Sequence, residues 1–435
     1  MTKNKIFVNM PYLPSIKSAK NLKNKTVLVR CDFDVPIDNT QNSNSNTQKK
    51  KIKIKDDSRL KTCIPTIEYL LKKQVKQIIL IGHLGRPKGQ IVPELSLAPV
   101  AEHLEKLLNS SFCHSRESGN PVADKLNINF IKNVDNLNKE ILKQVQDDKK
   151  LVMIENLRFN PGEEKNDKNF AKQLASLADI YINESFANSH RNSASVAIIK
   201  KYLPSYAGLN LEAEMKNLTA VLQKPKKPFV AIIGGAKIET KLPVINQFLK
   251  TANYVLVGGA VANDFLLAQG KEVGESLVDK DYIDEAKKIL KKLRNKEIEK
   301  LRDKKNKIKN YRLQITDYGL LLPTDFIWHK NKILDIGPKT IKKYCAIIKS
   351  AKTIVWNGPM GYFEDKKFAK GTNEIAKAIL NSKAQAVIGG GETGESIKSK
   401  VKNQKSKQKK NIFISTGGGA MLEFLGGEKL PGLKK

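Results

Sequence analysis

The sequence predicts an α/β protein made of two doubly wound lobes, each built on a parallel, Rossmann-like sheet. Short apolar runs alternate along the chain with longer stretches of helical character, the pattern typical of βα units. The 435 residues also exceed the ~250–300 residues at which a single hydrophobic core stops growing. Finally, the helical residues 211–222 follow no apolar run and end before Pro225 and Pro228. We therefore expect a helix and a hinge to join the two lobes.

The expected boundaries follow from this pattern. They are a first lobe over residues 1–205, an inter-lobe helix over 206–224, a second lobe over 225–424 and a C-terminal segment over 425–435. Polar or lysine-rich stretches that are unsuited to a core predict inserts. We expect these inserts near residues 39–53 and 110–150 in the first lobe, and near 294–319 and 398–410 in the second.

Four apolar runs predict the strands of the first lobe, at residues 27–29, 77–81, 151–154 and 180–182. Helices are expected between them, at about 58–71, 97–108 and 168–178. Asp57 or Ser58 is a candidate cap for the first of these helices, which places Arg59 near its start. Polar residues follow the strands, at the sheet edge where open α/β folds bind ligands.

Cationic side chains recur at these positions in the first lobe. They lie on or beside loops that follow predicted strands, or at a helix start: Arg59, Arg86, Arg158 and Arg191, with His83 and His190 nearby. Guanidinium groups match carboxylate and phosphate oxygens, so arginines that converge predict a small, multiply anionic ligand. The alternative for any one arginine is a surface ion pair, and a lone histidine is more often a local hydrogen-bonding group than a base.

The second lobe opens with the apolar strand 230–233 and the glycine pair Gly234-Gly235. We expect a helix to begin at this turn, with Lys237 and Lys241 one helical turn apart on one face. The free N–H groups and positive dipole of a helix start, together with two lysines, predict a phosphate site. The alternative is an ordinary βα turn with two solvated lysines.

The rest of this lobe repeats the same pattern. Strands are expected at residues 254–257, 353–356, 386–388 and 412–414, with a basic helical stretch over 281–309 and a helix opening near 335–338. Glycine-rich turns follow several of these strands, which indicates close approach of the backbone to a bound group such as a nucleotide. The chain has neither the P-loop pattern nor the protein-kinase motifs, so those two classes of kinase are excluded.

The net charge of +34 would be typical of a nucleic-acid-binding protein. Three windows, residues 49–55, 287–309 and 398–410, carry +5, +9 and +7 of it. No aromatic residue is interleaved with these lysines, whereas single-stranded nucleic-acid sites need stacking rings. We interpret the windows as solvated surface, with salt-dependent polyanion binding as the alternative. The four cysteines form no C-x-x-C pair and the N-terminus shows no secretory signal, which favours a reducing, cytoplasmic location and no structural zinc.

Nine segments occur in the order found in the phosphoglycerate kinase family, which the chain resembles over nearly its whole length outside the inserts. These segments are R-C-D-F-D-V-P, D-D-S-R, H-L-G-R-P-K-G, E-N-L-R-F-N-P-G-E-E, S-H-R, I-I-G-G-A-K, V-W-N-G-P-M-G-Y-F-E, I-G-G-G-E-T and S-T-G-G-G-A-M-L-E-F-L-G-G. The resemblance implies a monomeric glycolytic enzyme that moves a phosphoryl group between 1,3-bisphosphoglycerate and ADP, by direct in-line transfer after its lobes close. It also implies Mg²⁺ bound with ATP or ADP, no membrane or specific nucleic-acid partner, and a C-terminal segment that packs on the first lobe.

The resemblance also implies roles for individual residues. Those expected at the 3-phosphoglycerate site are Asp32, Phe33, Asp34, Arg59, His83, Leu84, Gly85, Arg86, Arg158 and Arg191. Those expected at the nucleotide are Lys237, Lys241, Asn357, Glu364 on the ribose, and Gly390, Gly391, Glu392 and Thr393, with Glu392 beside the magnesium ion. Arg59, Lys237 and Lys241 are the expected catalytic residues, which would neutralise charge on the transferred group.

Four departures from the family's pattern favour an alternative, a catalytically impaired relative that still binds nucleotide. Asp34 stands where the family has Asn, Glu392 where it has Asp, and Ala260 where it has a third glycine. The stretch over 323–335 is also shorter than in the family, while the stretch over 294–319 is longer and very basic.

Overall fold

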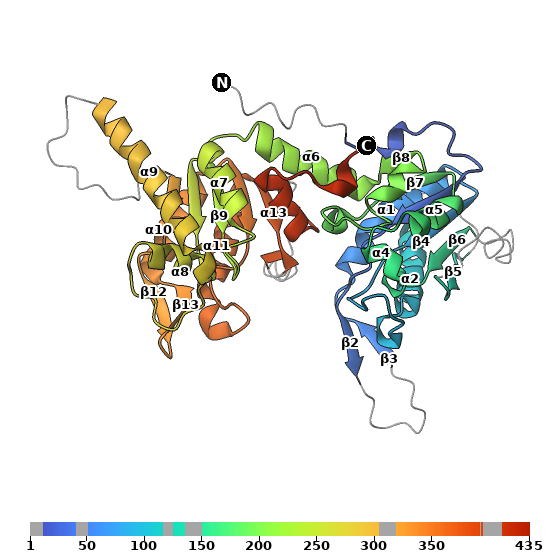
Figure 1. Cartoon of the computed structure of the whole chain (residues 1–435), viewed down its shortest axis with the longest axis horizontal. Helices are drawn as coiled ribbons and strands as arrows, with labels where there is room; N and C mark the ends of the chain where they lie inside the picture. The colour runs from blue at the N-terminus through green and yellow to red at the C-terminus, as the bar shows by residue number, and fades with distance from the viewer. Residues whose placement is uncertain are drawn as a thin grey trace. The chain divides into compact units, whose positions relative to one another are not determined.

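The computed structural model describes residues 12–40, 51–115, 125–134, 150–303, 319–391, 393–394 and 411–435. These residues form two compact units, and the chain passes from the first to the second between Met215 and Lys216. The C-terminal segment Lys429–Lys435 belongs to the first unit (Figure 1). Each unit is a six-stranded parallel sheet with helices packed on it, so the predicted fold class is confirmed.

The sheet of the first unit has the strand order β5-β6-β4-β1-β7-β8. All of its pairings are parallel. Its strands are β1 (Thr26–Arg30), β4 (Gln77–Ile81), β5 (Ile128–Ile131), β6 (Leu151–Ile154), β7 (Ile180–Asn183) and β8 (Ser205–Ala207). The central strands are buried on both faces, which explains why they are continuous apolar runs rather than alternating ones.

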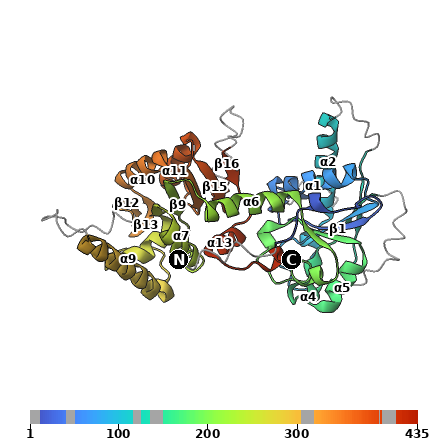
Figure 2. The ribbon, with the colours of Figure 1, turned by 90° about the horizontal axis from the view of Figure 1, so that it is seen from above.

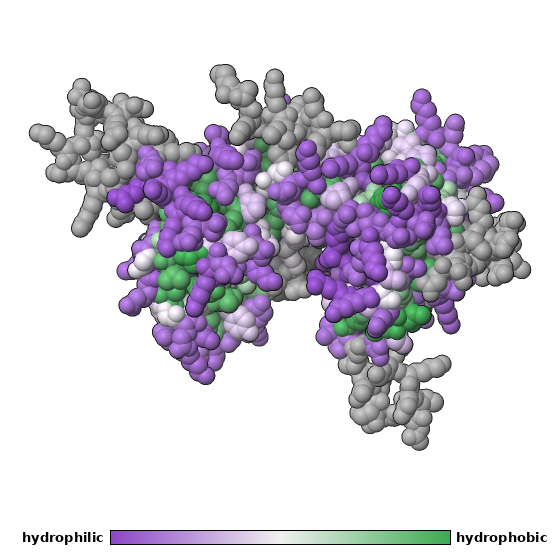
Figure 3. All heavy atoms as spheres, in the orientation of Figure 1, coloured by the Kyte–Doolittle hydropathy of each residue, from purple (hydrophilic) through white to green (hydrophobic). Residues whose placement is uncertain are grey.

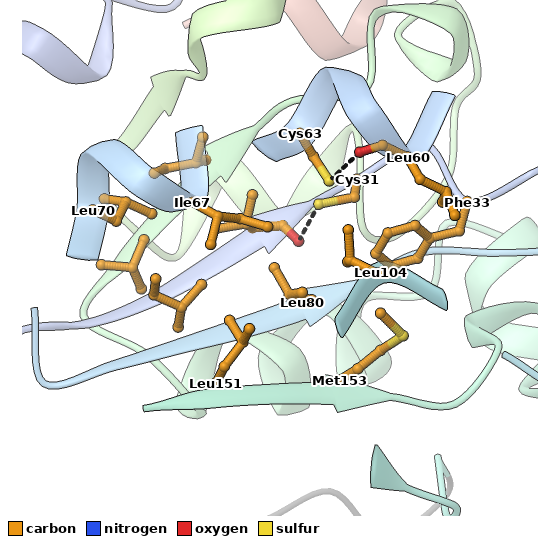
Figure 4. Close-up of a cluster of buried hydrophobic side chains, with 14 of the residues drawn as sticks. Cys31, Phe33, Leu60, Cys63, Ile67, Leu70, Leu80, Leu104, Leu151 and Met153 are labelled. Atoms are coloured by element: carbon orange, nitrogen blue, oxygen red, sulfur yellow. Dashed lines mark hydrogen bonds between the residues drawn. The ribbon is translucent and has the colours of Figure 1, made fainter. Parts of the chain in front are cut away.

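Helices cover both faces of this sheet. They are α1 (Ser58–Lys72), α2 (Ala98–Ser115), the short α4 (Pro161–Glu164) and α5 (Lys168–Ser176). On one face, Leu60 and Ile67 of α1 and Leu104 of α2 pack against Leu80 and Met153 of the sheet (Figure 4). On the other face, the apolar side of α5 packs over a second cluster. Two buried clusters on opposite faces define the doubly wound arrangement.

The second unit has the strand order β11-β10-β9-β14-β15-β16, again with every pairing parallel. Its strands are β9 (Phe229–Ile233), β10 (Tyr254–Val257), β11 (Gly319–Leu321), β14 (Thr353–Asn357), β15 (Gln385–Gly389) and β16 (Ile412–Ile414). Its helices are α7 (Leu242–Thr251), α8 (Gly259–Ala268), α9 (Ile283–Asp303), α10 (Pro338–Ser350), α11 (Lys370–Asn381) and α13 (Gly419–Gly426) (Figure 2). Helix α6 (Leu209–Gln223) leads from the first unit into the second.

Two antiparallel hairpins accompany the sheets, and neither was predicted. One joins β2 (Ile37–Thr40) to β3 (Lys51–Ile54), at the edges of the expected insert near 39–53. The other joins β12 (Phe326–His329) to β13 (Lys332–Ile336) through Lys330 and Asn331, both with positive φ. Two turn residues with positive φ give the tight hairpin turn that matches strand twist.

Three edge strands were also missed, and one expectation was wrong because of them. Helix α6 does follow a strand, since β8 precedes it. Strand β5 lies within the stretch 110–150, whose description as an insert stays a prediction. The missed strands read I-N-F-I, S-Y-A and G-L-L, so a polar or glycine residue interrupts or opens each of them, unlike the wholly apolar edge strand β16. Residues 41–50, 116–124, 135–149, 304–318 and 395–410, where the remaining parts of the expected inserts fall, lie outside the described residues.

The C-terminal segment is tied to the first unit through its backbone. The N–H of Leu13 donates to the carbonyl of Leu433 at 3.0 Å, and the N–H of Gly432 donates to Ser189 at 2.8 Å. The side-chain amide of Asn183, at the end of β7, donates to the Gly432 carbonyl at 3.0 Å. The segment therefore lies beside the loop that carries Arg191.

The face of the described residues that Figure 3 shows is mainly hydrophilic on both units, with apolar patches between the polar side chains. No helix among those residues combines the length and the apolar character needed to cross a bilayer.

Candidate active site

A cluster of charged side chains lies at the carboxyl ends of the first unit's strands. Arg59, in the first turn of α1, pairs with Asp32, in the loop after β1, with NH1 3.1 Å from Oδ2. The amide of Asn188 donates to Oδ1 of the same carboxylate at 3.3 Å. Burial raises the pKa of Asp32, and the charge of Arg59 opposes that rise. Asp32 thus orients the side chain of Arg59, which is 35% exposed and lies on the solvent side of the cluster.

Asp34 lies two residues after Asp32 in the same loop. Its Oδ1 accepts the backbone N–H of Gly85 at 2.9 Å, and its Oδ2 is 4.0 Å from Nε2 of His83. The departure at this position therefore places a carboxylate directly beside the predicted substrate residues. By contrast, the side chains of Phe33 and Leu84 are buried in the core, so these two predicted residues can offer a ligand only their backbone.

Arg158 is fixed by the short 3₁₀ turn at Leu157–Phe159, whose first N–H groups are capped by the Asn156 side chain. Its NH1 donates to the Gly85 carbonyl at 2.6 Å, and its Nε lies 3.1 Å from Glu164. Burial lowers the pKa of Arg158, and the nearby charge of Arg191 lowers it further. Two guanidinium groups that repel each other inside a protein are suited to a shared anion.

The remaining predicted cationic residues differ in their burial and in their hydrogen bonds. Nε of Arg191 and Nδ1 of His190 are buried and have no hydrogen-bond partner among the described residues. Arg86 lies in the same loop as Gly85 but is exposed. The charges of Arg59, Arg158 and Arg191 all lower the pKa of the buried His83, whereas Arg86 is exposed at the surface.

Arg30 was missed in the prediction of the site. It ends β1, it is 1% exposed, and its NH2 lies 2.8 Å from Nδ1 of His83. A charged residue that closes an apolar, doubly buried strand is the signal that identifies it, since a buried charge requires a partner.

In the second unit the prediction of a helix at Gly234-Gly235 was wrong. Helix α7 begins at Leu242, with Pro243 in its first turn and Lys241 as its N-cap. Proline is favoured in the first turn of a helix and is costly further inside, although Pro65 does lie within α1, so Pro243 agrees with a helix start at Leu242. Lys237 and Lys241 therefore lie in the turn before the helix rather than on one helical face. Lys237 is exposed, whereas Lys241 is buried with its Nζ 2.5 Å from Oδ1 of Asn357.

A cavity of about 310 Å³ opens beside these lysines. Backbone from the ends of β9, β14 and β15 and from the start of α13 forms its wall, and its polar residues are Lys237, Thr240, Lys241, Asn357 and Thr393. The hydroxyl of Thr393 accepts the N–H of Gly358 at 2.9 Å, and the Asn357 amide donates to Gly389 at 3.1 Å. Gly390 also lines the cavity, while Gly391 lies next to it at an exposed position. Lysines and glycine-rich strand ends around one cavity are suited to phosphate groups.

A second cavity of about 340 Å³ shares Gly235, Ala236 and Pro359 with the first. Its lining is mainly apolar and includes Ala260, Leu277, Phe326 and Met360, with Glu364 as a carboxylate on its wall. The unpredicted hairpin contributes Phe326 and part of β13 to this wall. An apolar cavity of this size next to a basic one has the form of a nucleoside pocket beside a phosphate site.

Two side chains of α8 stabilise the wall of this second cavity through hydrogen bonds. The side-chain amide of Asn263 donates to the carbonyl of Leu277 at 3.1 Å, and Oδ1 of Asp264 accepts the N–H of Asp279 at 2.7 Å. Burial raises the pKa of Asp264 to about 7. Asn263 and Asp264 were not predicted from the sequence, because both lie inside a helix that otherwise has apolar character.

The predicted metal ligand Glu392 lies outside the described residues. Among the residues that the structure does describe, no three His, Cys, Asp or Glu side chains are grouped so as to hold a metal ion.

One α/β unit carries a guanidinium cluster, and the other carries an apolar pocket suited to a nucleoside next to a lysine-lined cavity. This combination is typical of the two-substrate phosphotransferases that act on small anionic metabolites. The family model "Phosphoglycerate kinase" matches residues 16–428. The chain belongs to the phosphoglycerate kinase family.

Curated relatives and solved structures agree with this assignment. A phosphoglycerate kinase of Finegoldia magna is 39% identical over 433 residues, which span 95% of this chain and 96% of the relative. One of Pseudothermotoga lettingae is 40% identical over 420 residues, with 95% and 96% covered. The phosphoglycerate kinase structure from Coxiella burnetii matches with a TM-score of 0.72 and 32% identity, covering 97% of this chain and 98% of that one. That from Pyrococcus horikoshii gives 0.74 and 29%, with 96% and 97% covered.

Proposed function

We propose that the chain is an active phosphoglycerate kinase, which transfers a phosphoryl group between 1,3-bisphosphoglycerate and ADP in glycolysis. The observation that carries the proposal is the set of cationic side chains beside the strand ends of the first unit: Arg59 pairs with Asp32, Arg158 donates to Gly85, and the charges of both, with that of Arg191, lower the pKa of the buried His83. Such a cluster suits a three-carbon ligand with a carboxylate and a phosphate. The contiguous cavities of the second unit suit the nucleotide.

The catalysis that this arrangement supports is mainly electrostatic. The phosphoryl group moves between an acyl oxygen and the β-phosphate of ADP, and both are weak bases, so no strong general base is required. Positioning and neutralisation of charge then carry the rate enhancement. We assign Arg59 and Lys237 to the oxygens of the transferred group and Lys241 to the nucleotide phosphates. The N–H groups at the start of α13 add donors.

The lysine-lined cavity suits the phosphate groups of a magnesium–nucleotide complex, since Lys237 and Lys241 lie beside the glycine residues that follow β14 and β15. When bound with the nucleotide, Mg²⁺ supplies neutralisation of the phosphate charge. We assign Glu392 as the residue that holds it and Glu364 as the partner of the ribose.

The proposal extends to the molecule as a whole. We propose a cytoplasmic monomer with a substrate lobe over residues 1–205 and a nucleotide lobe over 225–424, in which in-line transfer follows closure of the lobes. No membrane partner and no specific nucleic acid are part of the proposal.

A coupled assay with 3-phosphoglycerate and Mg·ATP tests it. Turnover with normal saturation by both substrates is expected. Nucleotide binding without turnover, restored by the double change Asp34→Asn and Glu392→Asp, would instead favour the impaired relative.

A further inference from the structure

A buried histidine and a buried arginine form a pair beneath the guanidinium cluster. His83 and Arg30 are each 1% exposed, and NH2 of Arg30 lies 2.8 Å from Nδ1 of His83. A guanidinium group has only hydrogen-bond donors. Nδ1 of His83 must therefore accept, so it carries no proton.

The orientation of Arg30 is fixed on its other side. Its Nε donates to the hydroxyl of Ser195 at 2.9 Å, and the Ser195 hydroxyl donates to Oε1 of Glu163 at 2.6 Å. Oε2 of Glu163 accepts the Ser195 backbone N–H at 3.0 Å, and NH1 of Arg30 donates to the carbonyl of Cys31. The single hydroxyl proton of Ser195 is used on Glu163, so its oxygen is free to accept from Arg30. The guanidinium group consequently cannot rotate away from His83 without breaking its hydrogen bonds to Ser195 and Cys31.

The charges around His83 oppose a second proton on its ring. Burial lowers its pKa well below the usual value, and the neighbouring cations lower it further. These cations come from β1, the 3₁₀ turn after β6, the loop after β7 and α1, and they are Arg30, Arg158, Arg191 and Arg59. Asp34 is the facing carboxylate, with Oδ2 4.0 Å from Nε2. That distance is too long for a hydrogen bond.

Nε2 of His83 therefore carries the ring's one proton, yet it has no hydrogen-bond partner among the described residues. A buried donor without an acceptor is unfavourable. It lies among the cations that attract an anion, beside a carboxylate that is only half-buried.

We infer that Arg30 is a positioning residue, whose guanidinium group holds His83 as the neutral tautomer protonated on Nε2, so that this N–H is available to an anionic oxygen of the substrate. This inference rests on the proposed function. It makes His83 a hydrogen-bond donor rather than a cation or a base, while the arginines supply the charge. Turnover should then show no ionisation of His83 between roughly pH 5 and 8, the range in which an ordinary histidine titrates.

The test is ¹⁵N nuclear magnetic resonance of the full chain labelled at histidine, with His83→Gln used to assign the signal. In the unchanged protein, we expect a bare Nδ1 and a protonated Nε2 throughout that pH range. In Arg30→Met, which removes the donor but keeps an unbranched chain, the ring should populate both tautomers or titrate. The kcat/KM for 3-phosphoglycerate should then fall by ~10- to 100-fold and become dependent on pH in the same range.

Arg59→Met is the matched control, because Arg59 contacts Asp32 rather than His83. It should lower turnover but leave the tautomer of His83 unchanged. Arg30→Lys retains a donor and should keep the bare Nδ1, which provides a second variant if Arg30→Met does not fold. A protonated Nδ1 in the unchanged protein, or an Arg30→Met variant with the same tautomer and pH profile, would overturn the inference. Loss of the proposed function would look different, with no turnover in the unchanged protein whatever the tautomer of His83.

Discussion

Nζ of Lys241 lies 2.5 Å from Oδ1 of Asn357, and through this contact the turn after β9 is joined to the end of β14. Both residues line the lysine-lined cavity and are buried, whereas Lys237, four residues before Lys241 on the same lining, is exposed. The two lysines that look equivalent in the sequence thus have different environments. Lys241 forms part of the wall of the cavity, whereas the exposed side chain of Lys237 can move with a reacting group.

This difference predicts different effects of the two substitutions. Lys241→Met should destabilise the second unit by about 1–3 kcal/mol, because it leaves the buried oxygen of Asn357 without this donor. It should also raise the KM for ATP. Lys237→Ala should leave stability within about 0.5 kcal/mol and lower kcat by ~10³-fold. Urea unfolding and steady-state kinetics measure both, and equal effects of the two changes on stability would contradict the assignment.

Arg59→Ala should lower kcat by ~10³-fold or more, in the range of other cations that clamp a transferred phosphoryl group. It should affect the affinity for ADP little, because the described residues that line the two cavities of the second unit all belong to that unit. Single-turnover kinetics separate the chemical step from binding. Near-normal turnover in this variant would remove Arg59 from the mechanism.

Asp34→Asn should lower the KM for 3-phosphoglycerate by roughly five- to tenfold. The change removes a negative charge beside an anionic ligand, and two unit charges about 4 Å apart near a surface interact by ~1–4 kcal/mol. The amide oxygen of Asn can still accept the N–H of Gly85, so the loop should keep its shape. An unchanged KM would show that the carboxylate does not face the substrate.

Glu184 predicts a dependence of stability on pH. Its Oε1 accepts from Thr66 at 2.8 Å and from the N–H of Asn210 at 3.0 Å, and burial raises its pKa from 4.5 to about 8. The folded state therefore holds a proton that the unfolded state releases between these values. The stability from this group is complete below pH 4.5 and is lost as the pH rises towards 8, by at most ~1.4 kcal/mol per pH unit.

Glu184→Gln is the matched control for this prediction, since Gln keeps an oxygen for Thr66 and Asn210 but does not titrate. Urea unfolding of both proteins at a series of pH values should show the slope in the unchanged protein and its loss in the variant. Parallel pH dependences in the two would argue against the raised pKa.

Much of the fold could be predicted because buried parallel strands are continuous apolar runs. The strands at residues 77–81, 151–154, 254–257 and 412–414 were predicted with the observed ends. The edge strands β5, β8 and β11 and the hairpin of β12 and β13 were not predicted, since polar, glycine or exposed residues occur within them and weaken the apolar signal, whereas the equally short edge strand β16 is wholly apolar. The hairpin matters for function, because it forms part of the apolar cavity.

For the candidate site, the arginines could be predicted from their places after strands, but their partners could not. Which carboxylate holds Arg59, and that Arg30 reaches His83 rather than solvent, depend on contacts between segments far apart in the chain. The position of Lys237 was predicted wrongly because the glycine pair suggested a helix start, whereas Pro243 delays it.

In the proposed function, the first unit binds the three-carbon acid and the second binds the nucleotide. Calorimetric titration of the full chain with 3-phosphoglycerate and with ADP, for Arg158→Ala and for Lys241→Met, separates these two sites. We expect Arg158→Ala to lose affinity for 3-phosphoglycerate by ~10-fold or more and to keep that for ADP, and Lys241→Met to show the reverse. Loss of both affinities in one folded variant, or of neither in both, would rule out this division between the two units.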